Sequence, residues 1–257
     1  MTDPTLADLI RQHATLYASF DDGINADHSR GDPAARINDS VARHEPSGGR
    51  YGGCLAFEAR DHAWAEDEFT FAAADNFPYG SSSFAGTISL WLCGDPDADL
   101  HPDYPVDPFH ISRHAADGSF YLDLTRPNDD RYGSPRKLRF GLYGDSPVQD
   151  KFVGGQLIVV GELGWHDRRW HHLVATFSGA NSGASDAAAA LYIDGRLRGW
   201  ITGYRHALTW NVPELRIGLG QRYVGRIDEL LILDRALTAE QVAALYALPS
   251  PAGSCWA

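Results

Sequence analysis

The sequence is poor in cysteine, in basic residues and in long apolar segments. Its three cysteines, Cys54, Cys93 and Cys255, are odd in number and lack the paired spacing of a zinc site. This favours free thiols over a disulfide framework. Lys and Arg number 22 against 34 Asp and Glu, which gives a formal net charge of −12, and no basic cluster interrupts it. That charge argues against nucleic acid and anionic membranes as partners.

The N-terminal segment MTDPTLADLIRQHATLYASF contains acids near its start and no continuous apolar run of seven residues. It therefore matches neither a secretory signal nor a membrane span. The chain as written is expected to be cytoplasmic and soluble, whereas a truncated start would leave a secreted protein equally open. The localisation and the oligomeric state therefore stay unknown.

Short runs rich in β-branched and aromatic residues alternate with clusters of Gly, Pro, Asp and Asn, a pattern typical of strands joined by loops. Helix is scarce. We expect a single all-β domain built as a two-layer sandwich. The predicted strands cover residues 16–20, 53–59, 68–72, 85–93, 109–113, 119–125, 137–143, 156–161, 171–178, 189–194, 215–220 and 224–233.

Two short helices are predicted at the periphery. Thr238 followed three residues later by Gln241 forms a capping box, and apolar residues between 242 and 246 share one helical face. A second helical turn is expected from Thr5 to Gln12.

Several segments occur in a characteristic order, namely FDDG (20–23), AGTISLWL (85–92), WHHLVATF (170–177), LYIDGRL (191–197), LRIGLG (215–220) and GRIDELLILDRALTAEQVAALY (225–246). In this order they resemble the laminin-G-like jelly rolls of the concanavalin A-like lectin and glucanase superfamily. The resemblance implies a jelly-roll β-sandwich of two antiparallel sheets. It divides the chain into an N-terminal helical extension (1–14), a jelly-roll domain (15–247) and a C-terminal tail (248–257).

The resemblance also implies a structural Ca²⁺. In many members of the superfamily this ion joins the N-terminal strand to the last strand through an early acid, main-chain carbonyls and an aspartate of the final strand. The matching positions here are Asp21 in FDDG and Asp228 in RIDEL, with carbonyls near Gly52 and Gly53. Carboxylates and carbonyls suit Ca²⁺, which takes six to eight hard oxygen ligands.

Another interpretation of the same acids needs no metal. Asp228 could cap a bulge or pair with Arg226 or Arg235, and Asp21 could simply open the Asp-Asp-Gly turn. Glu229 follows directly, where strict alternation would place it on the apolar face of its strand. We expect a bulge or a salt bridge at Glu229.

Sugar recognition needs aromatic faces for stacking, flanked by groups that hydrogen-bond hydroxyls. The resemblance therefore implies a lectin-like, carbohydrate-binding module with a glycan or polysaccharide as its ligand. One or two of the loop tryptophans are expected to present exposed rings, and the segments HDRR, GYRH and GQRY combine hydrogen-bond donors with rings. The predicted ligand-binding residues are Trp165, His166, Arg168, Trp200, Tyr204, Arg222 and Tyr223.

Catalysis is not favoured by the sequence. Hydrolases of this superfamily carry an E-x-D-x-E strand motif, which is absent here, and Asp123 is alone in its strand. Arg139 and Tyr143 in KLRFGLY are residue types that lyases on related sandwiches use, but no complete set accompanies them. The alternatives left open are a polysaccharide lyase or glycoside hydrolase acting from the concave sheet face, and a protein-binding adhesion or scaffold module.

Overall fold

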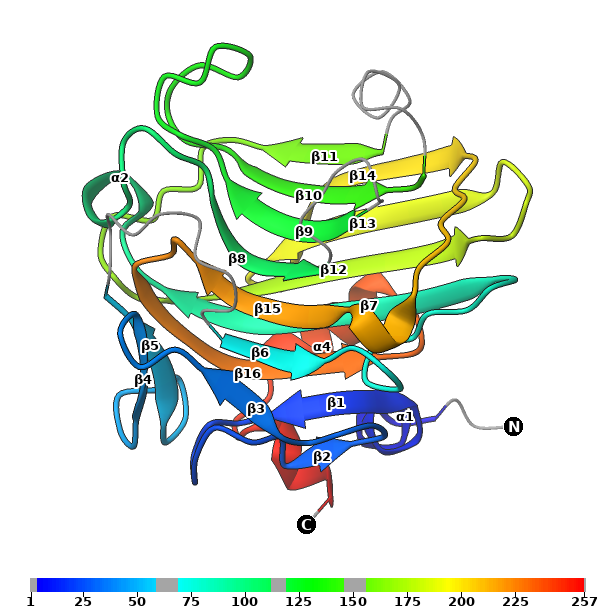
Figure 1. Cartoon of the computed structure of the whole chain (residues 1–257), viewed down its shortest axis with the longest axis horizontal. Coiled ribbons are helices and arrows are strands. Elements are labelled where there is room, and N and C mark those ends of the chain that lie inside the picture. Colours follow the sequence, from blue (N-terminus) through cyan, green and yellow to red (C-terminus); the bar gives the residue numbers. More distant parts are fainter. Residues whose placement is uncertain (1–3, 59–68, 112–118, 146–155, 257) are drawn as a thin grey trace.

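The computed structural model describes residues 4–58, 69–111, 119–145 and 156–256. These residues form two antiparallel sheets packed face to face, with short helices at the periphery (Figure 1). The predicted jelly-roll sandwich is confirmed. No helix within the described ranges has the length and apolar character needed to cross a membrane.

The larger sheet, called the back sheet below, has nine strands in the order β14-β13-β12-β7-β16-β1-β2, with β5 paired to β16 and β4 paired to β5. Its strands are β1 (Ala14–Ala18), β2 (His28–Ser29), β4 (Ala42–Glu45), β5 (Cys54–Phe57), β7 (Phe84–Cys93), β12 (Trp170–Ala180), β13 (Ala187–Ile193), β14 (Arg196–Tyr204) and β16 (Gly225–Leu233).

The other sheet, called the front sheet, has seven strands in the order β11-β10-β9-β8-β15-β6-β3. Its strands are β3 (Ala35–Ile37), β6 (Phe69–Ala72), β8 (Val106–Ile111), β9 (Ser119–Leu124), β10 (Leu138–Tyr143), β11 (Leu157–Val160) and β15 (Arg216–Gln221). The helical elements are α1 (Leu6–His13), α2 (Pro96–Asp99), η2 (Val212–Glu214), α4 (Ala239–Tyr246) and η3 (Ala252–Trp256).

The main core lies between the sheets and follows from the period-two alternation of each strand. On β9, Phe120, Leu122 and Leu124 are 0% exposed and point inward. On β7, Ile88 and Leu90 do the same from the opposite sheet. Full burial of one such side chain contributes roughly 1.5–3 kcal/mol, so this alternation fixes which face of each strand is left to face solvent.

A second apolar layer covers the outer face of the back sheet. Ile10 of α1 and Val242 of α4 pack there with Tyr17, Val174 and Leu231. Figure 1 shows α4 on the side of the back sheet that faces away from the front sheet. Both predicted helices are present, and each begins with a capping box. Helices α1 and α4 therefore both lie on the back-sheet side of the molecule.

The structure places β14 where the sequence predicted loops. Trp200 and Tyr204 lie on this strand, which is a correction of the predicted GYRH loop. Most side chains of β14 are exposed, and the strand begins with Arg196, Leu197 and Arg198. The alternation of apolar and polar residues that indicates a strand is therefore absent. Strands β2, β3 and β4 were missed for a related reason, because they are short edge segments.

Strand β16 contains the bulge expected at Glu229. Its pairing with β7 shifts register between Asp228 and Leu231, and Glu229 has a φ of +55°. The Glu229 carboxylate accepts hydrogen bonds from the Tyr17 hydroxyl at 2.9 Å and from the Ala252 N–H at 3.0 Å. The bulge therefore ties the last strand to the first strand and to the C-terminal turn η3.

Candidate functional site

Polar and aromatic side chains gather on the outer face of the front sheet. Because Phe120 and Leu122 point inward, Tyr121 and Asp123 on the same strand point outward. The same alternation turns outward a further group on β6, β8 and β10. We call the whole set the front-face cluster, which consists of Thr70, His110, Tyr121, Asp123, Arg139 and Tyr143.

Cross-strand pairing aligns part of this cluster in one row. Thr70 on β6 pairs with Gly218 on β15, and Gly218 pairs with His110 on β8. His110 pairs in turn with Tyr121 on β9, which pairs with Gly141 on β10. Directly paired residues on neighbouring strands lie about 5 Å apart. The row therefore crosses the strands of the front sheet as a continuous strip.

The two glycines of the row make room for its two rings. A Cβ atom on Gly141 would lie 2.4 Å from the Tyr121 ring, and one on Gly218 would lie 2.3 Å from the His110 ring. Real Cβ atoms do not approach so closely, so each ring lies flat over the backbone of the neighbouring strand. Tyr121 is partly exposed, whereas Thr70, His110, Asp123 and Tyr143 are each 5% exposed or less. The glycines therefore turn one aromatic face outward instead of an aliphatic side chain.

Hydroxyl groups meet at the centre of the cluster. The Tyr121 hydroxyl donates to the Tyr143 hydroxyl at 2.8 Å. Burial raises the pKa of both phenols, and the nearby Asp123 carboxylate acts in the same direction. Both groups therefore stay protonated at neutral pH and serve as hydrogen-bond donors and acceptors, not as bases.

Asp123 and Arg139 form a buried ion pair beside the tyrosines. Arg139 Nε donates to Asp123 Oδ1 at 2.7 Å, and Arg139 Nη2 contacts Asp123 Oδ2. Burial disfavours both charges, but the Asp123 carboxylate still holds the pKa of Arg139 above its ordinary value. Burial raises the pKa of Asp123. As a carboxylate–guanidinium pair the two groups carry no net charge. It is a rigid bidentate unit on a face that is otherwise built from neutral groups.

Two aromatic rings lie at the end of the face next to the loop between β9 and β10. The Arg139 guanidinium carbon is 5.4 Å from the Tyr132 ring centre, and that of Arg222 is 4.3 Å from the Tyr104 ring centre. Tyr104 is 43% exposed, whereas Arg222 is 4% exposed. The Tyr104 ring thus contacts Arg222 and also stacks on His101 with ring centres 4.7 Å apart, and the rest of the ring is exposed.

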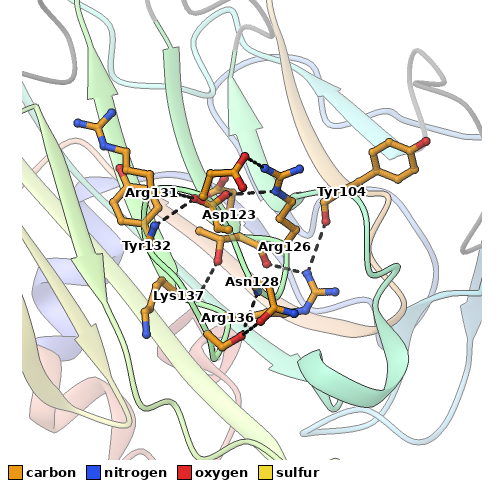
Figure 2. Close-up of polar contacts among 12 residues, drawn as sticks. Tyr104, Asp123, Arg126, Asn128, Arg131, Tyr132, Arg136 and Lys137 are labelled. Carbon is orange, nitrogen blue, oxygen red and sulfur yellow. Dashed lines mark hydrogen bonds and ion pairs between the residues drawn. The ribbon is translucent and has the colours of Figure 1, made fainter.

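Arg136 holds the loops that carry these rings. Its guanidinium donates to the main-chain oxygens of Thr125 and His101, each at 2.6 Å, and to that of Tyr104 at 3.5 Å. Figure 2 shows this arrangement, with the Tyr104 ring directed away from the other labelled side chains. The buried Arg136 side chain therefore holds the loops together at this end of the sandwich and fixes the main chain at Tyr104.

Of the predicted ligand residues, Trp165 and His166 lie together but away from the front-face cluster. They line a cavity of about 270 Å³ at one end of the sandwich, beside Pro96, Pro135 and Arg136. Trp165 is 4% exposed and stacks on His171 with ring centres 4.7 Å apart, so the expectation of an exposed ring there is wrong.

The remaining predicted residues are dispersed. Arg168 pairs with Asp99 at 2.6 Å, and the Tyr223 hydroxyl donates to Cys93 O at 3.2 Å inside the core. Arg222 supports Tyr104 at the front face. Trp200 and Tyr204 belong to the back sheet, where Trp200 is 67% exposed and Tyr204 is 9% exposed. The structure therefore does not gather these residues into one site.

The two predicted metal ligands converge on the loop at residues 47–53. Asp228 Oδ2 accepts from the N–H groups of Arg50 at 2.6 Å and Tyr51 at 3.2 Å. Asp21 Oδ1 accepts from the Gly53 N–H at 2.9 Å. A Cβ on Gly52 would lie 2.1 Å from Asp21 Oδ1, so the loop passes the carboxylate only because residue 52 is glycine.

Negative charge is concentrated and buried at this junction. Burial, with Glu229 next to it, raises the pKa of Asp228 to about 8, and burial raises that of Glu229 to about 7. Arg226, one of the alternative partners of Asp228, instead pairs with Glu45 at 2.6 Å. Among the described residues, the groups that stabilise the two carboxylates are N–H and O–H donors.

The donor types at this junction suit Ca²⁺. Within the described ranges no three side chains of His, Cys, Asp or Glu are grouped closely enough to hold a metal ion. Asp21 and Asp228 would therefore need main-chain oxygens to complete the coordination. Two main-chain oxygens lie near these carboxylates. A Cβ atom added to Gly53 would be 2.1 Å from the Phe20 oxygen, and one added to Gly49 would be 2.0 Å from the Gly53 oxygen. Such an ion requires hard oxygen donors. Asp228 Oδ1 also accepts from the Glu229 N–H at 2.8 Å, so Asp228 caps the bulge, as the alternative without a metal expects.

Comparison with known proteins identifies one family. The family profile described as the concanavalin A-like lectin/glucanases superfamily matches residues 65–243. No curated protein matches the chain in sequence.

Solved structures with the same fold include a domain of an arabinanase and the binding domains of toxins. One is domain 4 of AbnA, a GH43 extracellular arabinanase from Geobacillus stearothermophilus in complex with arabinotriose, with 18% identity, a TM-score of 0.55, and coverage of 92% of this chain and 98% of that one. Another is the botulinum neurotoxin serotype G binding domain, with 14% identity, a TM-score of 0.57, and coverage of 91% and 50%. The binding domain of Paraclostridial Mosquitocidal Protein 1 has 12% identity and a TM-score of 0.57, and the match covers 94% of this chain and 52% of that one. The chain thus spans about half of each toxin binding domain.

Proposed function

The chain belongs to the concanavalin A-like lectin/glucanases superfamily, and we propose that it is a carbohydrate-binding module whose site is the front-face cluster. The observation that carries the proposal is the row in which Gly218 and Gly141 allow the His110 and Tyr121 rings to lie flat across the sheet. A flat strip of rings bordered by hydroxyls and a fixed ion pair is what a sugar chain needs.

Each part of the strip has a chemical role in this proposal. The apolar C–H face of a sugar would stack on Tyr121 or on the exposed side of Tyr104. Sugar hydroxyls would bond to the Tyr121 hydroxyl, while the buried Asp123–Arg139 pair holds the strands on which the rings lie. Because that pair has no net charge and the chain carries −12, we propose a neutral glycan as the ligand.

The comparisons support carbohydrate as the ligand class only by likeness. The arabinanase domain that shares the fold is described in complex with arabinotriose. The described outward carboxylate of β9, Asp123, is engaged by Arg139, and the tyrosines are held protonated by burial. Neither arrangement supplies a free acid and base, so the proposed activity is binding without turnover.

A structural Ca²⁺ is part of the same proposal. The carboxylates of Asp21 and Asp228 would hold it together with main-chain oxygens near Gly53. The ion would supply positive charge at the junction of the first and last strands. The loop that wraps around these two residues would then be fixed from both sides.

The binding site is tested with two substitutions that should spare the core. Tyr104→Ala removes an exposed ring, and Tyr121→Phe removes one hydroxyl while keeping the ring over Gly141. Each should weaken retention on a glycan array by about fivefold, the effect of losing one contact of about 1 kcal/mol. Tyr204→Phe, which removes a hydroxyl from the back sheet, is the matched control and should bind as wild type.

A product assay on neutral and uronate-rich polysaccharides accompanies the array. Retention without products is the expected result. Unsaturated or reducing-end products above background would replace binding by a lyase or hydrolase activity. Equal retention by both front-face variants and the control would remove the front face as the site.

A further inference from the structure

A trough on the outer face of the back sheet lies on the side of the molecule opposite to the front-face cluster. Its floor is β13, where Ala188 and Ala190 are the outward residues between the core residues Ala189 and Leu191. It encloses about 230 Å³. Alanines leave the floor flat and low, so the neighbouring strands form its walls.

Strand register fixes what those walls present. Ala190 pairs with Thr176 on β12 and with Trp200 on β14. Ala188 pairs with Ser178 on β12 and with Thr202 on β14. One wall therefore carries two hydroxyls, and the other carries an indole ring next to a third hydroxyl. Tyr192 and Leu197, which also pair with each other, line the same trough.

Trp200 is unlike the other described tryptophans of this protein. It is 67% exposed, whereas Trp91, Trp165 and Trp210 are each under 9% exposed. Elsewhere the outer face of the back sheet is covered by α1, α4 and η3, whose apolar residues reach Val174 and Tyr192. The trough begins where that cover ends, so its indole face is open to a ligand.

The size and chemistry of the trough select its occupant. None of the described residues that line it is charged, which favours a neutral ligand. A volume of about 230 Å³ holds one sugar ring, whereas a stable protein interface needs about 800 Å² on each partner. Thr176 is 6% exposed and bonded to Tyr192, which leaves the Ser178 and Thr202 hydroxyls beside the ring. A ring for stacking with hydroxyls beside it matches a sugar, because a sugar has both an apolar face and a polar edge.

We propose that this trough is a second carbohydrate subsite, which takes one neutral sugar residue by stacking on Trp200, so that the chain binds glycans on two opposite faces. The inference rests on carbohydrate being the ligand class of the front face. A module with two opposed sites can join two polysaccharide chains, and it gains avidity on a surface that presents many copies of the ligand.

The test uses protein labelled with 5-fluorotryptophan, in which the ¹⁹F signal of Trp200 is identified by its loss in Trp200→Phe. Arabinotriose, xylotriose and cellotriose are titrated separately. We expect a saturable shift of the Trp200 signal with at least one of them. Trp200→Ala should weaken binding at the trough by at least about tenfold, and Trp200→Phe, which keeps a ring, by less.

A second variant fills the trough and keeps the Trp200 side chain itself. Ala190→Gln should abolish the Trp200 shift, whereas Ala184→Gln, at the exposed tip of the same hairpin, should leave it unchanged. Calorimetry should resolve two sites in wild type, of which Trp200→Ala weakens one by at least about tenfold and the front-face variant Tyr104→Ala weakens the other by about fivefold.

Each other outcome points to a different error. One bound sugar that Tyr104→Ala weakens and Trp200→Ala does not would overturn the second subsite and leave the front face standing. One bound sugar that only Trp200→Ala removes would overturn the two-faced arrangement and the front-face proposal together. No shift of the Trp200 signal with any of the three sugars would also overturn the trough as a subsite.

Discussion

Metal-free protein is expected to lose stability as the pH rises above about 6.5, and added Ca²⁺ is expected to restore it. Both effects originate at Asp228 and Glu229, whose pKa values burial raises from 3.8 to about 8 and from 4.5 to about 7. The folded state therefore holds protons that the unfolded chain has already released. Stability is fully present below the unfolded pKa values and declines as the pH rises through the folded ones.

Buried histidines act in the opposite direction and set the lower limit of this window. Burial lowers the pKa of His172 from 6.5 to about 3 and that of His206 from 6.5 to about 4. Their contribution is complete above pH 6.5 and is lost as the pH falls. Of these four residues, only Asp228 and Glu229 change charge above about pH 6.5. The free energy of unfolding is expected to fall by roughly 2–3 kcal/mol between pH 6.5 and pH 8.5.

Ca²⁺ bound between Asp21 and Asp228 would remove this loss, because a cation favours the ionised carboxylates. It would also stabilise the folded state by mass action, by about 2.7 kcal/mol when free Ca²⁺ is a hundred times its dissociation constant. Thermal unfolding with chelator and with Ca²⁺ at several pH values measures both the alkaline loss of stability and the stabilisation by bound Ca²⁺. The Ca²⁺ response should be larger at pH 8 than at pH 6.

Two variants separate the metal from the bulge. Asp228→Asn should remove most of the Ca²⁺ response and part of the alkaline loss. Glu229→Gln should reduce the alkaline loss but keep the Ca²⁺ response, because Glu229 is bonded to Tyr17 and Ala252 and not to the loop at residues 47–53. A melting curve that ignores both chelator and Ca²⁺, in protein shown to be metal-free, would contradict the metal site.

The architecture could be predicted from the sequence because most strands bury one face. All twelve predicted strands overlap strands of the structure, as residues 119–125 do with Ser119–Leu124. The predictions failed where a strand buries little. In β14 the burial pattern is mostly exposed, so its residues look like a polar loop until β13 pairs with them.

The front-face cluster could not be assembled from the sequence, because its residues come from strands that are neighbours only in the fold. His110 and Gly218 are far apart in the chain, yet they are paired residues on β8 and β15. The available signal was a glycine inside each of the strands KLRFGLY and LRIGLG, since glycine within a strand marks close approach of another group. That signal identifies a crowded position, but only the register identifies the crowding side chain.

The exposure of Trp165 and Trp200 could not be predicted from the sequence either. Both follow glycine-rich, polar segments, and the sequence predicted an exposed ring at each. The structure separates them, because the first is 4% exposed and the second is 67% exposed. Local composition cannot distinguish a ring that closes the end of the sandwich from one that projects from an edge strand.

Trp165→Ala is accordingly expected to lower the free energy of unfolding by about 3–5 kcal/mol, the usual result of truncating a large core side chain. Trp165 belongs to the main core and stacks on His171 with ring centres 4.7 Å apart, so its loss leaves a cavity and removes that contact. Trp200→Ala should change the same quantity by less than about 0.5 kcal/mol, as substitutions of exposed side chains usually do. Urea denaturation of both variants, with Trp165→Phe as an intermediate control, measures the difference. Similar midpoints for the two alanine variants would mean that Trp165 is not a core residue, and the cavity that it lines with His166 would then become the first place to look for a stacked sugar.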